Sequence, residues 1–185
     1  HRADGGTNVG RTVRNTNPEL AILAERIKAG DKEAYGRLIE VTQNRLLRFT
    51  LALTGDRTLA EDLCQETYVK AYGAIKSLTK NEAVLDWLFK IVKNLHLDFV
   101  RAKGNQSAAL EDSDLESVCV DEHDQVELIS VHKALSQFEP EDRHLLLLVD
   151  LEERSYEEAA QVLGISEDAV RTRISRLRKR FVEIF

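Results

Sequence analysis

The sequence has no methionine, two cysteines, two prolines and nine glycines among its 185 residues. Glycine and proline mark turns, so their scarcity argues against an all-β fold and favours long helices. Two cysteines, Cys64 and Cys119, are too few for a disulfide framework, which favours a reducing, cytoplasmic setting. No apolar run approaches the roughly 18–20 residues that cross a bilayer. We therefore expect no membrane insertion.

The sequence also lacks the residue patterns of catalytic and metal sites. Its histidines and cysteines show no spacing typical of a tetrahedral zinc site. Its carboxylates are scattered over helix-capping positions and form no acid–base pair. We therefore expect no cofactor and no enzymatic activity.

Charge is distributed unevenly along the chain. The 26 basic and 32 acidic side chains give a net charge of −6, yet residues 102–130 carry eight acidic side chains and one basic one. By contrast, residues 170–180 carry six cations and no acid. An acidic middle segment therefore separates a balanced front half from a tail with a basic end.

Residues 18–103 predict a four-helix N-terminal domain. Asn17-Pro18 and Asp31 are helix-start signals, and Thr58 with Glu61 fits a capping box. The expected helices are 18–29, 31–53, 58–75 and 84–102, with a loop at Lys76–Ala83. Residues 1–17 are polar and are expected to form a disordered tail.

Residues 104–122 have no hydrophobic period and are rich in Ser, Asp and Glu, so we expect a flexible acidic linker. Residues 123–185 then predict further helices, with a second capping box at Ser155 and Glu158. Gly164-Ile165-Ser166 forms a tight turn between two of them. The expected fold is all-α, with two small helical domains, the second a helix-turn-helix domain.

The last helix has the layout of a DNA-recognition helix. Val170, Ile174, Leu177 and Phe181 form its apolar stripe. Small polar side chains and arginines on the other sides suit base edges and phosphates in the major groove. The residues expected there are Asp168, Arg171, Thr172, Arg173, Ser175, Arg176 and Lys179. The alternative is a solvated basic face on a surface helix.

Two helices of the first domain have distinctive outer faces. Asp62, Gln65, Glu66 and Val69 form a polar face with an apolar centre, which fits either protein docking or simple solvation. The helix 84–102 is expected to present an aromatic among cations, a combination that suits single-stranded nucleic acid. Its residues are Trp87, Lys90, Asn94, Leu97 and Arg101. The alternative is that Trp87 packs at a domain edge.

In this order, these stretches resemble the extracytoplasmic-function (ECF) group of bacterial RNA polymerase sigma factors. The resemblance covers residues 18–185. It is carried by Asp31–Tyr35 (DKEAY), Ala60–Glu66 (AEDLCQE), Asp86–Leu95 (DWLFKIVKNL) with Asp98 and Arg101, Ser155–Ala160 (SYEEAA), Leu163–Ser166 (LGIS) and Val170–Arg180 (VRTRISRLRKR). One departure is Asp168-Ala169, where the family commonly has Gly-Thr.

The resemblance implies a protein that binds core RNA polymerase, recognises promoter −10 and −35 elements and helps to open the duplex. It places core polymerase on Asp62, Gln65, Glu66 and Val69. It places the single-stranded −10 element on Lys76, Ser77, Lys80, Asn81, Trp87, Lys90, Asn94 and Arg101. It places the duplex −35 element on the recognition-helix residues named above. It also implies an anti-sigma factor as a partner.

Two other functions fit the same residues. The first is a stand-alone helix-turn-helix regulator, which would act without polymerase. The second is a sigma mimic that titrates an anti-sigma factor and would tolerate loss of Arg171, Arg173 and Arg176.

Overall fold

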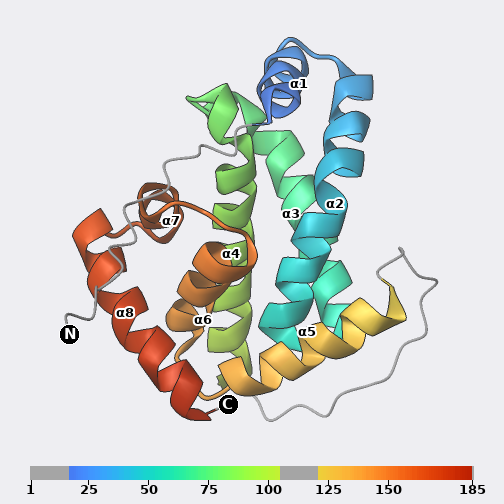
Figure 1. The fold of residues 1–185 in the computed structure, drawn as a ribbon. Helices are drawn as coiled ribbons and strands as arrows, with labels where there is room; N and C mark the ends of the chain where they lie inside the picture. The colour runs from blue at the N-terminus through green and yellow to red at the C-terminus, as the bar shows by residue number, and fades with distance from the viewer. Residues whose placement is uncertain (1–16, 105–120, 185) are drawn as a thin grey trace.

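A computed structural model describes residues 17–104 and 121–184, and it places eight α-helices in them (Figure 1). The N-terminal group contains α1 (Pro18–Lys28), α2 (Lys32–Thr54), α3 (Arg57–Ala74) and α4 (Val84–Gly104), with 3₁₀ turns η1 (Ile75–Ser77) and η2 (Asn81–Ala83) between α3 and α4. The C-terminal group contains α5 (Glu122–Leu135), α6 (Pro140–Leu146), the π-helical turn η3 (Leu147–Leu151), α7 (Tyr156–Leu163) and α8 (Glu167–Ile184).

The described residues contain no strand, which confirms the all-α expectation. None of the helices in these ranges is long and apolar enough to cross a membrane. The expected tail, residues 1–17, lies outside the described residues except for Asn17. The expected linker, residues 104–122, lies outside them except for Gly104, Asp121 and Glu122.

Side-chain caps set the starts of the N-terminal helices. The Asn17 side chain accepts a hydrogen bond from the Glu19 N–H at 3.0 Å, and Asp31 caps α2 in the same way. The capping box predicted at Thr58 and Glu61 is wrong. Asp56 caps α3 instead by accepting from the Leu59 N–H at 3.1 Å, since aspartate is at least as good an N-cap as threonine.

The helix-turn-helix predictions are confirmed. Ser155 and Glu158 form the full capping box of α7, with hydrogen bonds of 3.1 and 2.9 Å. Gly164 ends α7 at φ +68°, a left-handed conformation that suits glycine. The Ser166 hydroxyl then accepts from the Ala169 N–H at 3.1 Å at the start of α8.

A single hydrophobic core joins the two helix groups. Phe49 of α2 lies 4.9 Å from Phe89 of α4 and 5.8 Å from the His144 ring of α6, measured between ring centroids. Helices α5, α6 and α7 with η3 pack on α2 and α4, and we call this surface the junction. Figure 1 shows α5 crossing the lower end of α2 and α6 lying beside α4. The sequence had left the relative placement of the groups open.

Candidate functional site

The exposed side of α3 carries the residues expected to bind polymerase. Asp62, Gln65, Glu66 and Val69 are all exposed. Val69 leaves 72% of its surface open. We call these residues, together with Tyr72, the α3 face.

Tyr72 extends the α3 face by one turn and was missed in the sequence. It is 49% exposed, and its ring meets Tyr35 of α2 edge-on at a centroid distance of 4.9 Å. Its spacing of three residues from Val69 is the signal that could have found it. The sole ion pair between α3-face acids and a described cation is Glu66–Lys70, at 3.9 Å. The face is therefore acidic at one end and apolar at the other, and its charges are almost unpaired.

The loop between α3 and α4 is held by a lysine from α1. Lys28 Nζ donates to the Leu78 carbonyl oxygen and, at 2.6 Å, to Asn81 Oδ1. Leu78 is buried beneath the loop, whereas Lys76, Ser77 and Lys80 are exposed. Asn81 is half-buried, and its side-chain oxygen Oδ1 supports the loop by accepting the hydrogen bond from Lys28. Only the side-chain NH₂ group of Asn81 is therefore left for a ligand.

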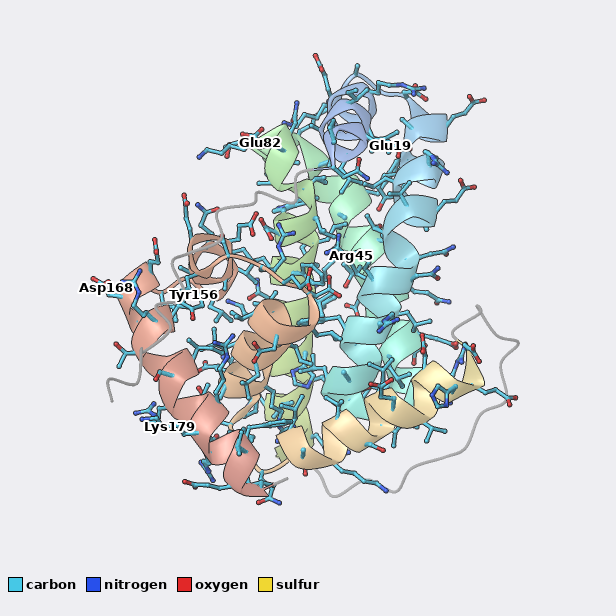
Figure 2. The ribbon with its side chains drawn as sticks, in the orientation of Figure 1. Glu19, Arg45, Glu82, Tyr156, Asp168 and Lys179 are labelled. Atoms are coloured by element: carbon cyan, nitrogen blue, oxygen red, sulfur yellow. The ribbon has the colours of Figure 1, made fainter. Side chains whose placement is uncertain are left out.

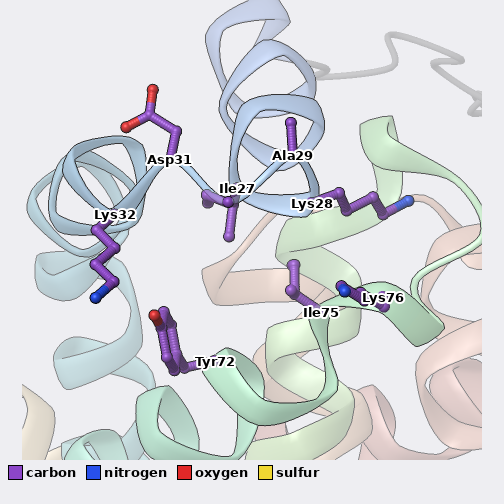
Figure 3. A pocket seen from close by; sticks show the side chains of 9 residues that line it. Ile27, Lys28, Ala29, Asp31, Lys32, Tyr72, Ile75 and Lys76 are labelled. Atoms are coloured by element: carbon purple, nitrogen blue, oxygen red, sulfur yellow. The ribbon is translucent and has the colours of Figure 1, made fainter.

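A cavity of about 290 Å³ lies beside this loop, where α1, α2 and α3 meet (Figure 3). Its lining includes Lys28, Lys32, Lys76 and Tyr72, with Asp31 at the edge. Arg26 Nη2 lies 2.6 Å from Asp31, and hydrogen bonds from the Ala34 N–H and Arg26 keep the pKa of Asp31 below its usual value. The cavity therefore adjoins both Tyr72 of the α3 face and Lys76 of the loop.

The outer side of α4 is only partly open. Lys90, Asn94 and Arg101 are exposed as expected, and Arg101 Nη1 lies 3.3 Å from Asp98. Trp87 is half-buried and packs against the core, so the expected aromatic platform is only partly available. Lys93 of the same helix is also half-buried, and burial lowers its pKa.

The recognition helix α8 exposes its expected face. Thr172, Ser175, Arg176 and Lys179 are exposed, and Val170, Ile174 and Leu177 are buried against α6 and α7. Figure 2 shows Asp168 and Lys179 on the side of α8 that points away from the other helices.

Several arginines of α8 are held by acids of this chain. Arg173 is half-buried, and its Nη2 lies 2.6 Å from Asp142 Oδ1. Arg178 Nη2 lies 2.5 Å from Asp150 Oδ1, and this hydrogen bond raises the pKa of Arg178. Arg173 therefore faces α6 and is less available to phosphate than the sequence suggested.

Arg171 is paired within α8 itself. Its Nη1 lies 3.0 Å from Asp168 and its Nη2 lies 3.1 Å from Glu167. The Asp168 carboxylate therefore has a cation beside it, although the residue is fully exposed to an approaching ligand. Neither Arg176 nor Lys179 has an ion pair with any residue in the described ranges.

The structure brings some of these surfaces together and separates others. The α3 face and the loop at residues 76–81 are neighbours because the loop continues from the end of α3. Helices α6 and α7 lie between α8 and α4 (Figure 1). The chain therefore has one continuous candidate surface on its N-terminal group and a separate one on α8.

Family models match both helix groups. The model described as Sigma-70 region 2 matches residues 38–106, and the model described as Sigma-70, region 4 matches residues 128–181. The ECF RNA polymerase sigma factor SigM of Bacillus subtilis is 31% identical over 152 residues, which cover 80% of this chain and 93% of that protein.

Two solved structures share the fold at 25% identity. CnrH, solved in complex with the cytosolic domain of CnrY, matches with a TM-score of 0.72 over 90% of this chain and 96% of that one. The sigma factor RpoE of Bartonella quintana, solved with the anti-sigma factor NepR, matches with a TM-score of 0.64 over 81% and 95%.

Proposed function

The chain belongs to the ECF group of RNA polymerase sigma factors, which are transcription initiation factors, and we propose how its surfaces share that work. Core RNA polymerase and promoter DNA are its partners. The α3 face would bind core polymerase, the loop and α4 would hold the −10 strand, and α8 would read the −35 duplex. The two DNA-binding units would be residues 18–103 and 123–185, joined by 104–122.

The observation that carries this proposal is the α3 face. An exposed valine and tyrosine at one end, beside acids that have a single ion pair of 3.9 Å, combine the apolar and polar areas of a protein-binding surface. Val69 and Tyr72 are neighbours at a spacing of three residues, and both are exposed, at 72% and 49%, so the apolar surface here comes from a pair of side chains and not from a single one.

The face of α8 supports contact with duplex DNA. Thr172, Ser175 and Arg176 are exposed and project from the N-terminal and middle turns, where a recognition helix meets base edges. Arg171 and Lys179 flank them and would contact phosphates. Arg173 would contribute mainly by fixing α8 on Asp142, because that ion pair is half-buried.

The −10 surface is supported by position and charge. Lys76 and Lys80 are exposed on the loop, and Lys90, Asn94 and Arg101 are exposed on α4. Ser77 and the amide of Asn81 would offer hydrogen bonds to an unpaired base, and Trp87 would offer only the edge that packing leaves open. Cations and a partly open aromatic suit a melted strand.

All of these roles are binding roles. We propose that the protein acts in the cytoplasm, beside polymerase, without a catalytic group or cofactor of its own. The described residues hold no cluster of histidine, cysteine or carboxylate side chains that could bind a metal ion.

Run-off transcription with purified bacterial core polymerase and a promoter panel tests this proposal. The wild-type chain should give promoter-specific transcripts, and Asp62→Lys with Glu66→Lys should remove them. Glu33→Lys with Glu40→Lys, two exposed acids of α2, is the matched control and should keep them. If the wild-type chain binds core polymerase but gives no transcripts, a sigma mimic is favoured. If it neither binds core polymerase nor gives transcripts, a stand-alone regulator is favoured.

We also propose an anti-sigma factor as a partner, because a solved chain of the same fold is bound to one. Such a protein would compete with core polymerase for this chain. Adding it in equal amounts to the run-off reaction should abolish transcripts, and excess core polymerase should restore them. Inhibition that excess core leaves unchanged would contradict competition.

A further inference from the structure

One lysine of α1 joins the two turns of the loop between α3 and α4. Lys28 Nζ donates to the carbonyl oxygen of Leu78, the residue that follows η1. It also donates, at 2.6 Å, to Oδ1 of Asn81, the first residue of η2. Each turn is closed by its own backbone hydrogen bond, of 3.1 Å for η1 and 3.0 Å for η2. Lys28 therefore connects two turns that these backbone bonds close separately.

The helix that carries Lys28 is firmly placed. Helix α1 buries Leu20, Leu23 and Ile27, and it packs on α2, η1 and η2. Lys28 is half-buried, so its hydrogen bonds to the loop are partly sheltered from water. A hydrogen bond from an ammonium ion is roughly twice as strong as one between neutral groups. The loop is therefore held to a rigid support by two strong hydrogen bonds.

The charge of Lys28 is directed at the loop. Among the described residues no carboxylate forms an ion pair with Lys28, so its two hydrogen-bond partners in the loop are neutral oxygens. In Figure 3 Lys28 extends from the end of α1 toward the loop, and Lys32 extends from the start of α2 on the opposite side of the cavity. Lys32 therefore offers a matched comparison, a cation that lines the same cavity from the other side.

The hydrogen bond from Lys28 decides which end of the Asn81 amide is left for a ligand. An asparagine side chain carries an oxygen that accepts and an NH₂ group that donates, whereas an ammonium group only donates. The Asn81 oxygen must therefore face Lys28, and the NH₂ group is left for a ligand. Without Lys28 the amide would be free to turn over, and Asn81 would then both donate and accept.

This orientation has a consequence for the bases that Asn81 can bind. An unrestrained asparagine amide recognises adenine with two hydrogen bonds, since it accepts from the 6-amino group and donates to N7. When Lys28 holds the Asn81 oxygen, the NH₂ group can still donate to N7, but the oxygen is not placed to accept from the 6-amino group. The held amide therefore gains little from that amino group, whereas a released amide would gain one hydrogen bond.

We propose that Lys28 is a positioning residue of the −10 surface, which holds the loop to α1 and presents Asn81 to the unpaired strand as a hydrogen-bond donor. Lys28 acts through the loop and through Asn81, without contacting the strand. The effect on base selectivity rests on the function proposed above, whereas the hold on the loop does not.

Hydrogen exchange of backbone amides, followed by NMR spectroscopy in the full chain, tests the hold on the loop. Lys28→Met keeps a long stem and removes the donors, so the Leu78 and Ala83 amides should exchange at least about fivefold faster. Lys28→Arg can still donate to both oxygens and should restore slow exchange. Lys32→Met is the control, and the Glu158 amide in the capping box of α7 reports the rest of the fold. Unchanged loop exchange in Lys28→Met would overturn the proposal.

Affinities for two 12-nucleotide single strands test the base selectivity. One strand carries adenine at every position, and the other carries purine, the same base without its 6-amino group. Each variant is compared on the same two strands, so losses of phosphate contact cancel in the ratio of affinities. Lys28→Met should shift this ratio at least about threefold toward adenine, the effect of one modest hydrogen bond. Asn81→Ala in that background should remove the shift, and Lys32→Met should not produce it.

The results distinguish failure of this inference from failure of the proposed function. If both strands bind and the ratio stays constant while the loop amides exchange faster, Lys28 does not orient Asn81. A shift that persists in the Asn81→Ala background would overturn the assignment to Asn81. If neither strand binds to the wild type or to any variant, the −10 surface proposed above is contradicted, and the exchange rates decide whether Lys28 holds the loop.

Discussion

The outward faces of α3 and α8 and the inward surface of the junction use similar side chains in opposite ways. On the outward faces, Asp62, Glu66 and Arg176 are exposed and almost unpaired. At the junction, Asp86 and Arg154 are buried and bonded to each other. The difference teaches that an exposed charge is available to another molecule, whereas a buried charge stabilises the fold through its partner in this chain.

The same contrast applies to stability. An exposed ion pair contributes at most about 1 kcal/mol, because water screens it. A buried pair contributes through the penalty that follows when one partner is lost. Substitutions on the outward faces should therefore change binding and leave unfolding unchanged, whereas substitutions at the junction should change unfolding first.

The largest expected effect is on the α3 face. Val69→Glu puts a charge at the apolar end of the α3 face and should weaken core polymerase binding by about 100-fold, or about 3 kcal/mol. Titration with labelled core polymerase measures it. Ile22→Glu on α1 is the control, since Ile22 is also highly exposed at 57%. Both variants should unfold within about 0.5 kcal/mol of wild type. A large loss of stability in Val69→Glu would contradict the expectation that substitutions on the outward faces change binding and leave unfolding unchanged.

At the junction, Gly55→Ala should cost about 2–3 kcal/mol in the free energy of unfolding. Gly55 has φ +65°, and a Cβ there would lie 2.3 Å from His132 Cδ2 of α5. Gly164→Ala is the control, with φ +68° and no atom within 4 Å, so it should show only the backbone strain of about 1 kcal/mol. Urea denaturation measures both. Equal losses would mean that α5 does not close on the end of α2.

The His96–His144 pair should make unfolding depend on pH. Burial lowers the pKa of His96 to about 4 and that of His144 well below its usual value, with Arg143, His132 and Lys93 adding repulsion. The unfolded chain therefore binds more protons between pH 6.5 and about 4. Above pH 6.5 neither histidine changes the free energy of unfolding. Below pH 6.5 each histidine lowers the free energy of unfolding by about 1.4 kcal/mol per pH unit.

Denaturation at pH 7.5 and 5.5 measures this slope. His144→Gln should reduce the loss between these values by about 1.4 kcal/mol relative to wild type. Asp86 and Glu152 titrate with the opposite sign, because burial raises their pKa values, but both are present in each protein and cancel in the difference. His123→Gln, at an exposed position on α5, is the control. An unchanged slope in His144→Gln would contradict a neutral buried pair.

The smallest expected effect compares two arginines of α8. Arg176→Ala should weaken duplex DNA binding by about 1 kcal/mol and lower the slope of log K against log salt by about 0.9. Arg178→Ala should do less, because Asp150 already holds that guanidinium. Fluorescence anisotropy over a salt series measures both. If the two variants had equal slopes of log K against log salt, the ion pairs of α8 would not determine which of its cations contact DNA.

Much of the fold followed from local signals in the sequence. The capping box at Ser155, the glycine at residue 164 and the apolar stripe of α8 act within one or two turns, so the sequence predicted them directly. The start of α3 was misplaced because Asp56 and Thr58 are both good caps and only geometry selects between them.

The exposed faces were predicted better than the junction. The polymerase-binding residues proposed on α3 lie on one exposed side because helical periodicity fixes which residues share a face. Asp86 and Arg154 are 68 positions apart, and no local pattern couples them. Trp87 was expected to be open, but packing against the core leaves it half-buried.

The π-helical turn Leu147–Leu151 has a consequence for chain length. A π-turn arises when a helix accommodates one residue more than the α-helical spacing allows. Because the π-turn absorbs this residue within about the same total rotation, removing one residue there would return the helix to regular winding and leave Glu152 and Arg154 facing Arg45 and Asp86. Removing one residue from the α-helical part of α6 would instead rotate everything after it by about 100° and turn both side chains away from their partners. Homologous chains can therefore be one residue shorter in this turn and still pair their two helix groups through the same contacts.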